Sequence, residues 1–247
     1  MTKIWVTYLA AIIIITTAVV PISAESRDSL PPVSFIVSTM EARAAARSEM
    51  LSSYTVLRRY EVTNRHRHAE MLVRMTCTAD GERHFTILDK SGSEAIRKHV
   101  FRKMLKEEAR ASSSGTRSTI QISPKNYLFR LVGMDSVDGR PAYVLEVTPR
   151  AKRKYLIRGR IWVDAADFAI SRVEGSPAKK PSFWTRSVHF LRKYKKVGPL
   201  WLAQSTNSVT EVRIFGSASL SITDFDYLLS PSATSLISQI PHGGLQP

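Results

Sequence analysis

Polar and apolar residues alternate in short runs along most of this chain, a pattern typical of half-buried β-strands. The runs cover residues 54–63, 69–78, 84–88, 127–134, 142–148, 154–163, 168–174, 183–194, 200–208, 209–215 and 219–227. Tight-turn pairs such as Asp80-Gly81, Asp138-Gly139 and Gly198-Pro199 separate neighbouring runs. Because most consecutive runs have no helix between them, the pattern predicts an antiparallel meander rather than alternating parallel strands and helices.

Two segments follow the helical period instead. The first spans residues 35–51, where several apolar positions share a face: Phe35, Ile36, Val37, Met40, Ala44, Met50 and Leu51. The second runs from Ser93, a suitable N-cap residue, to about Ala109, with a narrow apolar stripe and a basic remainder. Residues 111–115, which are mostly serine and end in glycine, are expected to form a flexible loop.

About ten strands in one antiparallel sheet are not expected to stay flat, because strand twist accumulates across a wide sheet. We therefore expect a mainly β, α+β fold, in which a strongly curved antiparallel sheet or unclosed β-barrel encloses a helical lid. The two predicted helices are long enough to fill the concave face. An apolar cavity between the sheet and the helices would then be the natural place for a ligand.

The first two dozen residues have the layout of a secretory signal peptide. Lys3 gives a positive start, an apolar run follows over residues 8–20, and Ala24 offers a small residue at the cleavage point. The apolar run is shorter than the roughly 20 residues that a membrane-spanning helix needs. An uncleaved anchor is the alternative, because Ile22 is an unusual third residue before the cut. We expect cleavage after Ala24 and a periplasmic location.

Beyond the predicted signal peptide at 1–24, the sequence favours one domain. A polar leader covers residues 25–34, a single domain covers 35–229, and a tail rich in Ser, Pro and Gly covers 230–247 and is expected to be disordered. The only cysteine, Cys77, excludes an internal disulfide framework. Its strand-like surroundings predict a buried, apolar role rather than a catalytic thiol.

The chain is strongly basic, with 36 Lys and Arg against 21 Asp and Glu and a formal net charge of +15. Such an excess favours anionic partners. Because an exported protein does not meet cellular nucleic acid, we expect no nucleic-acid partner. Anionic phospholipid head groups or glycolipids at a membrane surface are the better candidates. The simpler alternative is that the charge serves solubility alone.

Sequence signatures of catalysis are missing: there is no GxSxG, HExxH, Walker loop, GxGxxG or CxxC. We therefore expect neither enzyme activity nor a cofactor. His66 and His68 would share a strand face, but they lie in an Arg-rich turn that favours solvent exposure over metal binding. Asp164 and Asp167 flank a predicted turn, where aspartate favours backbone capping over an acid–base pair. We therefore expect no metal site.

Aromatic residues cluster in the C-terminal strands and are the best candidates for a ligand-binding surface. The predicted wall of an acyl-binding cavity consists of Trp162, Phe183, Trp184, Trp201 and Phe215. Ordinary sheet core is the alternative for these side chains, because strand alternation places large apolar residues on both faces of the sheet.

Two arginines are predicted to lie at the mouth of that cavity. Arg158 and Arg160 would share one strand face, opposite Ile157, Gly159 and Ile161. From such a rim, their guanidinium groups could bind phosphate or carboxylate head groups. A solvated strand edge, where cationic residues prevent aggregation, is the alternative.

Three segments resemble a known superfamily. Residues 158–164 (RGRIWVD) and 168–175 (FAISRVEG) are similar to the G-x-I-W-V-D … I-x-R-V-E strand-turn-strand of bacterial outer-membrane lipoprotein-sorting and carrier proteins, the LolA-like superfamily. Residues 194–202 (YKKVGPLWL) resemble its next hairpin. The resemblance spans residues 35–228. It implies an unclosed antiparallel barrel over a helical lid, with a cavity for acyl chains. The basic helix at 93–110 has no counterpart in this resemblance.

The superfamily includes periplasmic lipoprotein carriers, sigma-factor regulatory sensors and mycobacterial lipid carriers. The resemblance and the residue pattern together predict an exported periplasmic carrier, which holds acyl chains of lipoproteins or lipids for transfer toward the outer membrane. Its partner would be a lipidated protein or a lipid. The alternative is an envelope sensor or interaction protein of the same fold that binds a protein partner.

Overall fold

The computed structural model describes residues 30–179, 185–212 and 216–231. The chain divides between Leu30 and Pro31 into two units, and all the helices and strands named below belong to the second unit. The predicted signal peptide, the first half of the polar leader and most of the predicted disordered tail lie outside the described residues.

A single sheet of ten strands dominates this unit, and every neighbouring pair is antiparallel. The strands are β1 (Leu51–Asn64), β2 (His68–Cys77), β3 (Arg83–Gly92), β4 (Tyr127–Val137), β5 (Arg140–Pro149), β6 (Ile157–Asp164), β7 (Ile170–Pro177), β8 (Thr185–Val197), β9 (Leu200–Val212) and β10 (Gly216–Pro231). The predicted mainly β, α+β class and antiparallel meander are confirmed.

One predicted strand boundary was wrong. The sequence pattern divides residues 200–215 into two strands, whereas the structure has one continuous strand β9 through residue 212. Ser208 and Val209 pair without interruption with Leu220 and Ser219 of β10. No Gly, Pro or Asp marks a turn at that point, so the backbone stays extended and keeps its ladder.

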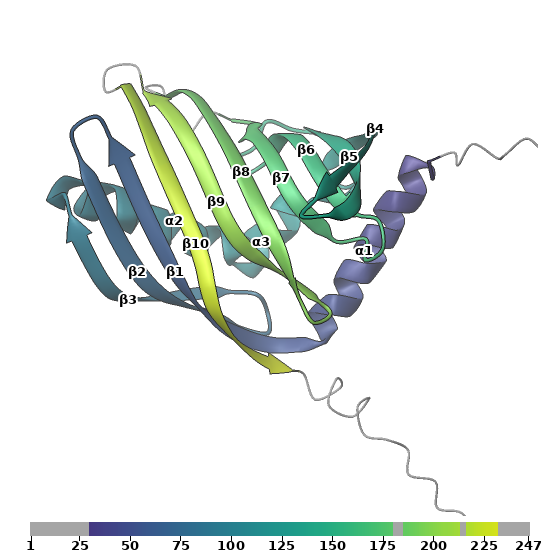
Figure 1. Cartoon of the computed structure of the whole chain (residues 1–247), viewed down its shortest axis with the longest axis horizontal. Helices are drawn as coiled ribbons and strands as arrows, with labels where there is room; N and C mark the ends of the chain where they lie inside the picture. Colours follow the sequence, from purple (N-terminus) through teal and green to yellow (C-terminus); the bar gives the residue numbers. More distant parts are fainter. Residues whose placement is uncertain (1–29, 180–184, 213–215, 232–247) are drawn as a thin grey trace, which may run out of the picture. The chain divides into compact units, whose positions relative to one another are not determined.

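The strand order is β3-β2-β1-β10-β9-β8-β7-β6-β5-β4, so the sheet has two free edges and is not a closed barrel (Figure 1). The last strand β10 inserts beside β1, which closes the gap between the N-terminal hairpins and the meander. The sharp turn before β5 follows from local chemistry, because Asp138 and Gly139 both have positive φ, 49° and 78°. Such a turn matches the twist of a hairpin.

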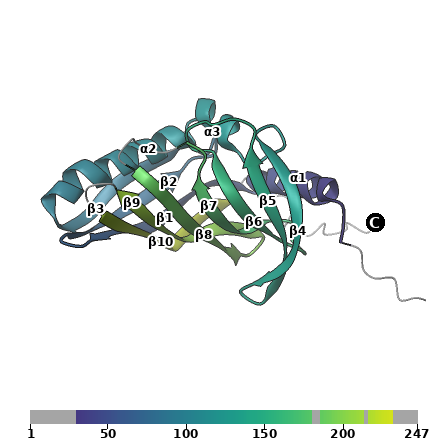
Figure 2. The same cartoon turned by 90° about the horizontal axis from the view of Figure 1, so that it is seen from above.

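All the helices lie against one face of the curved sheet (Figure 2). A row of cross-strand partners identifies this face, because directly opposed residues point the same way. The row contains Met71, Tyr60, Ile222, Thr206, Arg192, Val173, Ile161 and Leu145. Its ends are apolar and its centre is polar, so two separate cores form on the concave face.

The first core lies beneath α1 (Val33–Glu49). Ile36, Val37 and Met40 are at most 5% exposed and pack against β4–β7. Their sheet partners are Tyr127, Leu145, Val147, Leu156, Ile161, Val163 and Val173. These three helix residues all belong to the first half of α1, and this concentration decides how the helix can move relative to the sheet.

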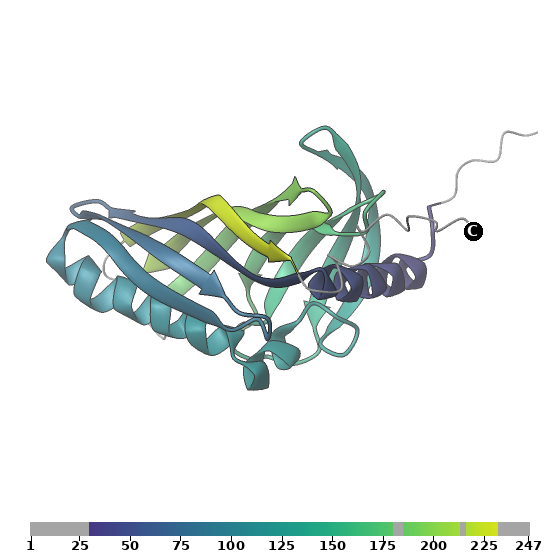
Figure 3. The same ribbon diagram turned by 90° about the horizontal axis from the view of Figure 1, so that it is seen from below.

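The second core lies at the other end of the sheet, beneath the π-helical η1 (Ile96–Phe101) and α2 (Arg102–Ser112) (Figure 3). Ile96 and Phe101 pack against Tyr60, Val62, Ala69, Met71, Val73 and Ile222. A helix over residues 93–109 was predicted, and the observed one continues to residue 112.

An ionic cluster at the centre of the concave face ties α2 to the sheet. Arg58 of β1 is 6% exposed, and its Nε donates to Asp224 Oδ1 of β10 at 2.5 Å. Its Nη1 donates to Glu108 Oε2 of α2, also at 2.5 Å. The hydroxyl of Tyr60 donates to the other Glu108 oxygen at 2.9 Å. The pairing satisfies charges that burial would otherwise make costly.

The expected flexible loop at 111–115 was wrong. Residues up to 112 belong to α2, and a third helix, α3 (Ser114–Ile120), follows at once. The side-chain amide of Asn126 donates to the carbonyls of Ser118 and Gln121 at 3.0 and 2.9 Å, which satisfies acceptors at the end of this helix. The residue that caps the helix therefore lies five residues beyond Gln121, outside the polar sequence of the helix itself.

Candidate functional site

A cavity of about 760 Å³ lies between the second half of α1, α3 and the start of β1. Its walls include Ala44, Ala45, Arg47, Ser48, Leu51, Tyr54, Cys77, Arg117, Ile120 and Gln121. A second cavity of about 450 Å³ adjoins it and is lined by Met40, Ala169, Ile170, Tyr194, Leu200, Trp201 and Leu202, among others. Both volumes fall within the range of small-molecule binding sites.

The two cavities share part of their lining, so we name them together the α1 cavity. Residues common to both are Glu41, Ala44, Arg47, Ser48, Leu51, Tyr54 and Gln121. Burial raises the pKa of the Tyr54 hydroxyl to about 12, so this hydroxyl stays protonated even at alkaline pH. The smaller cavity has mainly aliphatic and aromatic walls, whereas the larger one adds four serines and Arg117.

The second half of α1 forms the roof of this space and is loosely held. After Met40 no residue of α1 is buried, and only Glu41 and Arg47 are even half-buried. The alanines here, including Ala44, fill little space beneath the helix. Most of the apolar anchorage of α1 therefore lies in its first half, and polar contacts must hold the rest.

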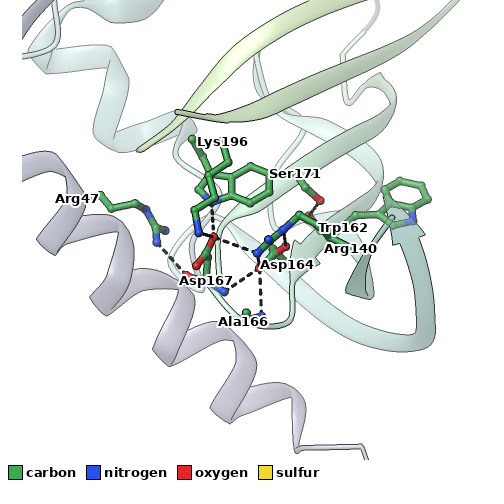
Figure 4. Close-up of polar contacts among 9 residues, drawn as sticks. Arg47, Arg140, Trp162, Asp164, Ala166, Asp167, Ser171 and Lys196 are labelled. Atoms are coloured by element: carbon green, nitrogen blue, oxygen red, sulfur yellow. Dashed lines mark hydrogen bonds and ion pairs between the residues drawn. The ribbon is translucent and has the colours of Figure 1, made fainter. Parts of the chain in front are cut away.

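Arg47 supplies such a contact. One terminal nitrogen of its guanidinium donates to the backbone carbonyl of Asp167 at 2.9 Å (Figure 4). The other donates to the backbone carbonyl of Phe168 at 3.3 Å. Phe168 adopts a left-handed φ of 50°, and its ring packs edge-on against Phe35 and beside Tyr143. The turn between β6 and β7 therefore holds α1 at two places along its length.

Asp164 shapes that turn. It is 1% exposed, and its Oδ1 accepts hydrogen bonds from the backbone N–H groups of Ala166 and Asp167 at 3.1 and 2.8 Å. Arg140 of β5 donates hydrogen bonds to both carboxylate oxygens, from Nε to Oδ2 at 2.6 Å and from Nη2 to Oδ1 at 2.9 Å. Burial opposes ionisation, but these hydrogen bonds outweigh it and lower the pKa of Asp164 below its ordinary value. The predicted capping role is therefore observed, with an ion pair added.

Asp167 connects the turn to the β8–β9 hairpin. Its Oδ2 accepts from Lys196 Nζ at 2.7 Å and from Trp201 Nε1 at 3.0 Å, and lies 3.3 Å from Arg140 Nη2. Partial burial opposes ionisation, but the bonds from Lys196 and Trp201 outweigh it and lower the pKa of Asp167. The Arg140 guanidinium also lies over the Trp201 ring, 5.7 Å from its centroid. Trp201 is thereby fixed at the edge of the α1 cavity.

The structure separates the predicted wall residues. Trp201 lines the α1 cavity. Phe183, Trp184 and Phe215 lie outside the described residues. Trp162 is 5% exposed and belongs to a small cluster with Val137, Ala142 and Val144. Its neighbours in β6, Ile161 and Val163, pack under α1, so Trp162 points to the opposite face of the sheet.

The predicted rim arginines share the face of Trp162. Arg158 and Arg160 line a shallow groove of about 470 Å³ with Trp162, Arg172 and Glu174, whereas Ile157 and Ile161 face α1, as the alternation predicted. The Trp162 indole donates to Asp135 Oδ2 at 2.9 Å, and Arg172 lies 4.2 Å above its ring. These residues therefore form a second surface and do not border the α1 cavity.

The described residues contain no grouping of three or more His, Cys, Asp or Glu side chains that could hold a metal ion. The exposed His68 ring instead lies 2.9 Å from Thr63 Oγ1 and 3.1 Å from Glu70 Oε1. Cys77 is buried, as its surroundings predicted. No helix among the described residues is both long and apolar enough to cross a bilayer.

The sequence pattern placed Ala44 on the apolar face of the first helix but assigned Arg47 no role in a site. An arginine in an alanine-rich helix has no local partner, and its acceptors lie about 120 residues away. Only the regular spacing of apolar residues in the first half of α1 and their scarcity in the second half could have indicated a partly free roof.

No family model matches the chain, and no curated protein matches it significantly. Solved structures are similar in fold. A DUF1329 family protein from Desulfovibrio piger is 14% identical, covering 81% of this chain and 94% of that protein, with a TM-score of 0.43. A putative outer membrane lipoprotein-sorting protein domain from Vibrio parahaemolyticus is 12% identical, with coverages of 78% and 92% and a TM-score of 0.41.

A LolA superfamily protein from Nitrosomonas europaea is also 12% identical, covering 78% of this chain and 93% of that protein, with a TM-score of 0.35. This last protein carries the name of the superfamily that the sequence resembles. A likeness of this degree concerns the fold alone.

Proposed function

We propose that this protein is a carrier that holds an acyl chain, of a lipid or a lipidated protein, in the α1 cavity. The observation that carries the proposal is the cavity itself, between an apolar stretch of the concave sheet face and a helix half without buried residues. No covalent step is needed, and we expect no enzyme activity. The periplasm, which the predicted signal peptide implies, is where such a carrier would work.

Apolar contact supplies the binding energy in this proposal. Each methylene group that leaves water contributes roughly 0.8 kcal/mol, so a chain of several methylenes binds without specific polar contacts. Leu51, Ile170, Leu202 and Trp201 offer the apolar surface, and the serines and charged groups of the larger cavity would face the polar end of the cargo.

The second half of α1 would act as the movable roof. The buried apolar residues of α1 all lie in its first half. Lifting the second half would therefore break the two Arg47 hydrogen bonds without exposing a core. Two such hydrogen bonds contribute on the order of 1 kcal/mol each, which a bound chain could offset. Entry and release would follow from making and breaking this contact.

The first test is native mass spectrometry of the mature protein, with solvent extraction of whatever copurifies. We expect a stoichiometric lipid or acylated species that a fluorescent fatty acid displaces. A protein that copurifies with no lipid or acylated species and does not bind the fluorescent fatty acid would overturn the carrier proposal.

A pair of matched variants locates the binding site. Ala44 lines both parts of the α1 cavity, whereas Ala46 lies on the same helix, is equally exposed and lines neither. Ala44→Trp should occupy the space of at least two methylene groups of the bound chain, which together contribute roughly 1.6 kcal/mol. Because about 1.4 kcal/mol corresponds to a tenfold change in affinity, probe binding should weaken by more than about tenfold. Ala46→Trp should bind like the wild type. Equal affinities for both would remove the α1 cavity from the proposal.

The alternative function is binding of a protein partner in the envelope. One observation favours it: the free edge strand β4 exposes Leu128, Val132 and Met134 by 51%, 43% and 47%. An exposed apolar edge can accept a strand from another chain. An empty cavity together with loss of an envelope partner in a Val132→Lys variant would favour this alternative.

A further inference from the structure

The basic helix formed by η1 and α2 has no part in the proposed carrier function, and its outer side is cationic. The exposed cations here are Lys90 at the end of β3 and Lys98, Arg102, Lys103, Lys106 and Arg110 on the helix. With the exposed apolar residues Ile87 and Val100 they define what we call the α2 surface. This surface covers the far end of the sheet from α1 (Figures 2 and 3).

The acidic residues of α2 are turned away from this surface. Glu108 binds the buried Arg58 and the Tyr60 hydroxyl. Glu107 accepts from Lys154 Nζ at 2.5 Å and from the Tyr155 hydroxyl. Because these contacts use both carboxylates, the helix presents its positive charges outward. Two acids remain exposed nearby: Glu94, which pairs with Lys98 at 2.5 Å, and Asp89.

Apolar groups are interleaved with these charges. Ile87 on the free edge strand β3 is 47% exposed and lies in the groove beside Lys90 and Lys98, and Val100 on η1 is 37% exposed. Exposed apolar side chains at a basic helix are unfavourable in water but favourable at a lipid interface, where they enter the head-group region.

A groove of about 290 Å³ between the helix and β3 combines the two chemistries. Its floor contains Met71, Phe101 and Leu105, and its walls contain Lys90, Arg97, Lys98 and Arg102 beside Glu94. The Nε of Arg97 is buried and has no hydrogen-bond partner among the described residues. A buried donor without an acceptor is costly, and an incoming anionic oxygen would satisfy it.

We propose that the α2 surface docks onto an anionic phospholipid bilayer, with a lipid phosphate in the groove beside Arg97. Cations attract the lipid phosphates, and the side chains of Ile87 and Val100 insert between the head groups. An anionic polysaccharide would use the charges but gains nothing from the exposed apolar residues, which is why the geometry favours a bilayer.

The experiment is cosedimentation of the mature protein with vesicles of phosphatidylglycerol and phosphatidylcholine, compared with vesicles of phosphatidylcholine alone. We expect binding to the anionic vesicles only, weakened by salt. Lys103→Gln/Lys106→Gln removes two exposed charges. The loss should be about fivefold per lysine, because each basic residue near an anionic surface contributes about 1 kcal/mol.

A matched control removes two charges from β1 and β2, on the face of the sheet that is turned away from α2. Arg59 and Arg74 are exposed and alternate with the buried Arg58 and Val73, so they point away from α2. Arg59→Gln/Arg74→Gln should bind anionic vesicles like the wild type. Equal losses in both double variants would show that net charge alone drives binding and would overturn the proposal.

A third variant separates the bilayer from other anionic partners. Ile87→Ser/Val100→Ser keeps every charge, and it should weaken vesicle binding severalfold while leaving binding to a soluble anionic polysaccharide unchanged. Vesicle binding that is unaffected by this variant would assign the surface to polymers and refute the bilayer. Ala44→Trp, which tests the carrier function, should bind vesicles normally, so the two proposals fail independently.

Discussion

Asp164→Ala removes the carboxylate that holds the β6–β7 turn together, and it should destabilise the folded unit by about 2–3 kcal/mol. The wild-type side chain is 1% exposed and accepts four hydrogen bonds, two from Arg140 and two from the backbone. Alanine leaves both groups of donors without their acceptor.

The magnitude follows from what each donor can regain from solvent. The Arg140 side chain is 39% exposed, so water recovers much of its lost interaction and we assign about 1 kcal/mol to the pair rather than the 3–5 kcal/mol of a fully buried one. The two backbone N–H groups belong to a surface turn and contribute about 0.5–1 kcal/mol each. Asp164→Asn keeps an oxygen for the backbone and should cost about half as much.

The assay is equilibrium unfolding in urea, monitored by circular dichroism. The dependence of the unfolding free energy on urea concentration is compared between variants. For a unit of this size the loss corresponds to a fall in Tm of roughly 5–10 °C. Asp89→Ala serves as control, because Asp89 is exposed on the edge strand β3. If Asp164→Ala changed the unfolding free energy by no more than this control, the hydrogen bonds described for the turn would not stabilise it.

Two further predictions concern pH and backbone spacing. The pKa values of Asp164 and Asp167 are lowered in the folded state, so the stability they confer is present above their ordinary pKa of about 3.9 and is lost as pH falls below it. Urea unfolding across this range should show a smaller loss for Asp164→Asn than for the wild type, and parallel curves would contradict the assignment. A Cβ at Gly159 would meet the backbone of β7, whereas one at Gly115 meets nothing within 4 Å. Gly159→Ala should therefore cost more than about 3 kcal/mol and Gly115→Ala less than about 0.5 kcal/mol in the same assay; similar values would refute the close strand contact.

Local chemistry was sufficient to predict most of the strands and turns. The Asp138-Gly139 pair specifies positive φ at both positions, and alternation in β6 correctly placed Arg158 and Arg160 opposite Ile161. Asp164 was correctly predicted as a turn cap. These features depend on neighbouring residues alone, because side-chain period and turn geometry are set within a few positions.

The candidate site could be predicted only in part. Both Trp162 and Trp201 lie in strands with large apolar residues on either side, so alternation cannot tell the concave face from the convex one. The pairing of α1 with β4–β7 made that choice, and it left Trp201 at the cavity and Trp162 outside it. The helix α3 was not predicted either, because the residue that caps it, Asn126, lies beyond its end in the chain.

By itself, the amino-acid sequence determined the antiparallel strands, the basic helix and the strong positive charge, because each follows from composition or from a short repeat of residue types. The tertiary structure alone decided which face is covered, where a cavity remains and which charges are neutralised. Arg47 meets its acceptors, and Glu108 meets Arg58, only after segments far apart in the chain have packed together. Such contacts depend on three-dimensional distance, which no local pattern encodes.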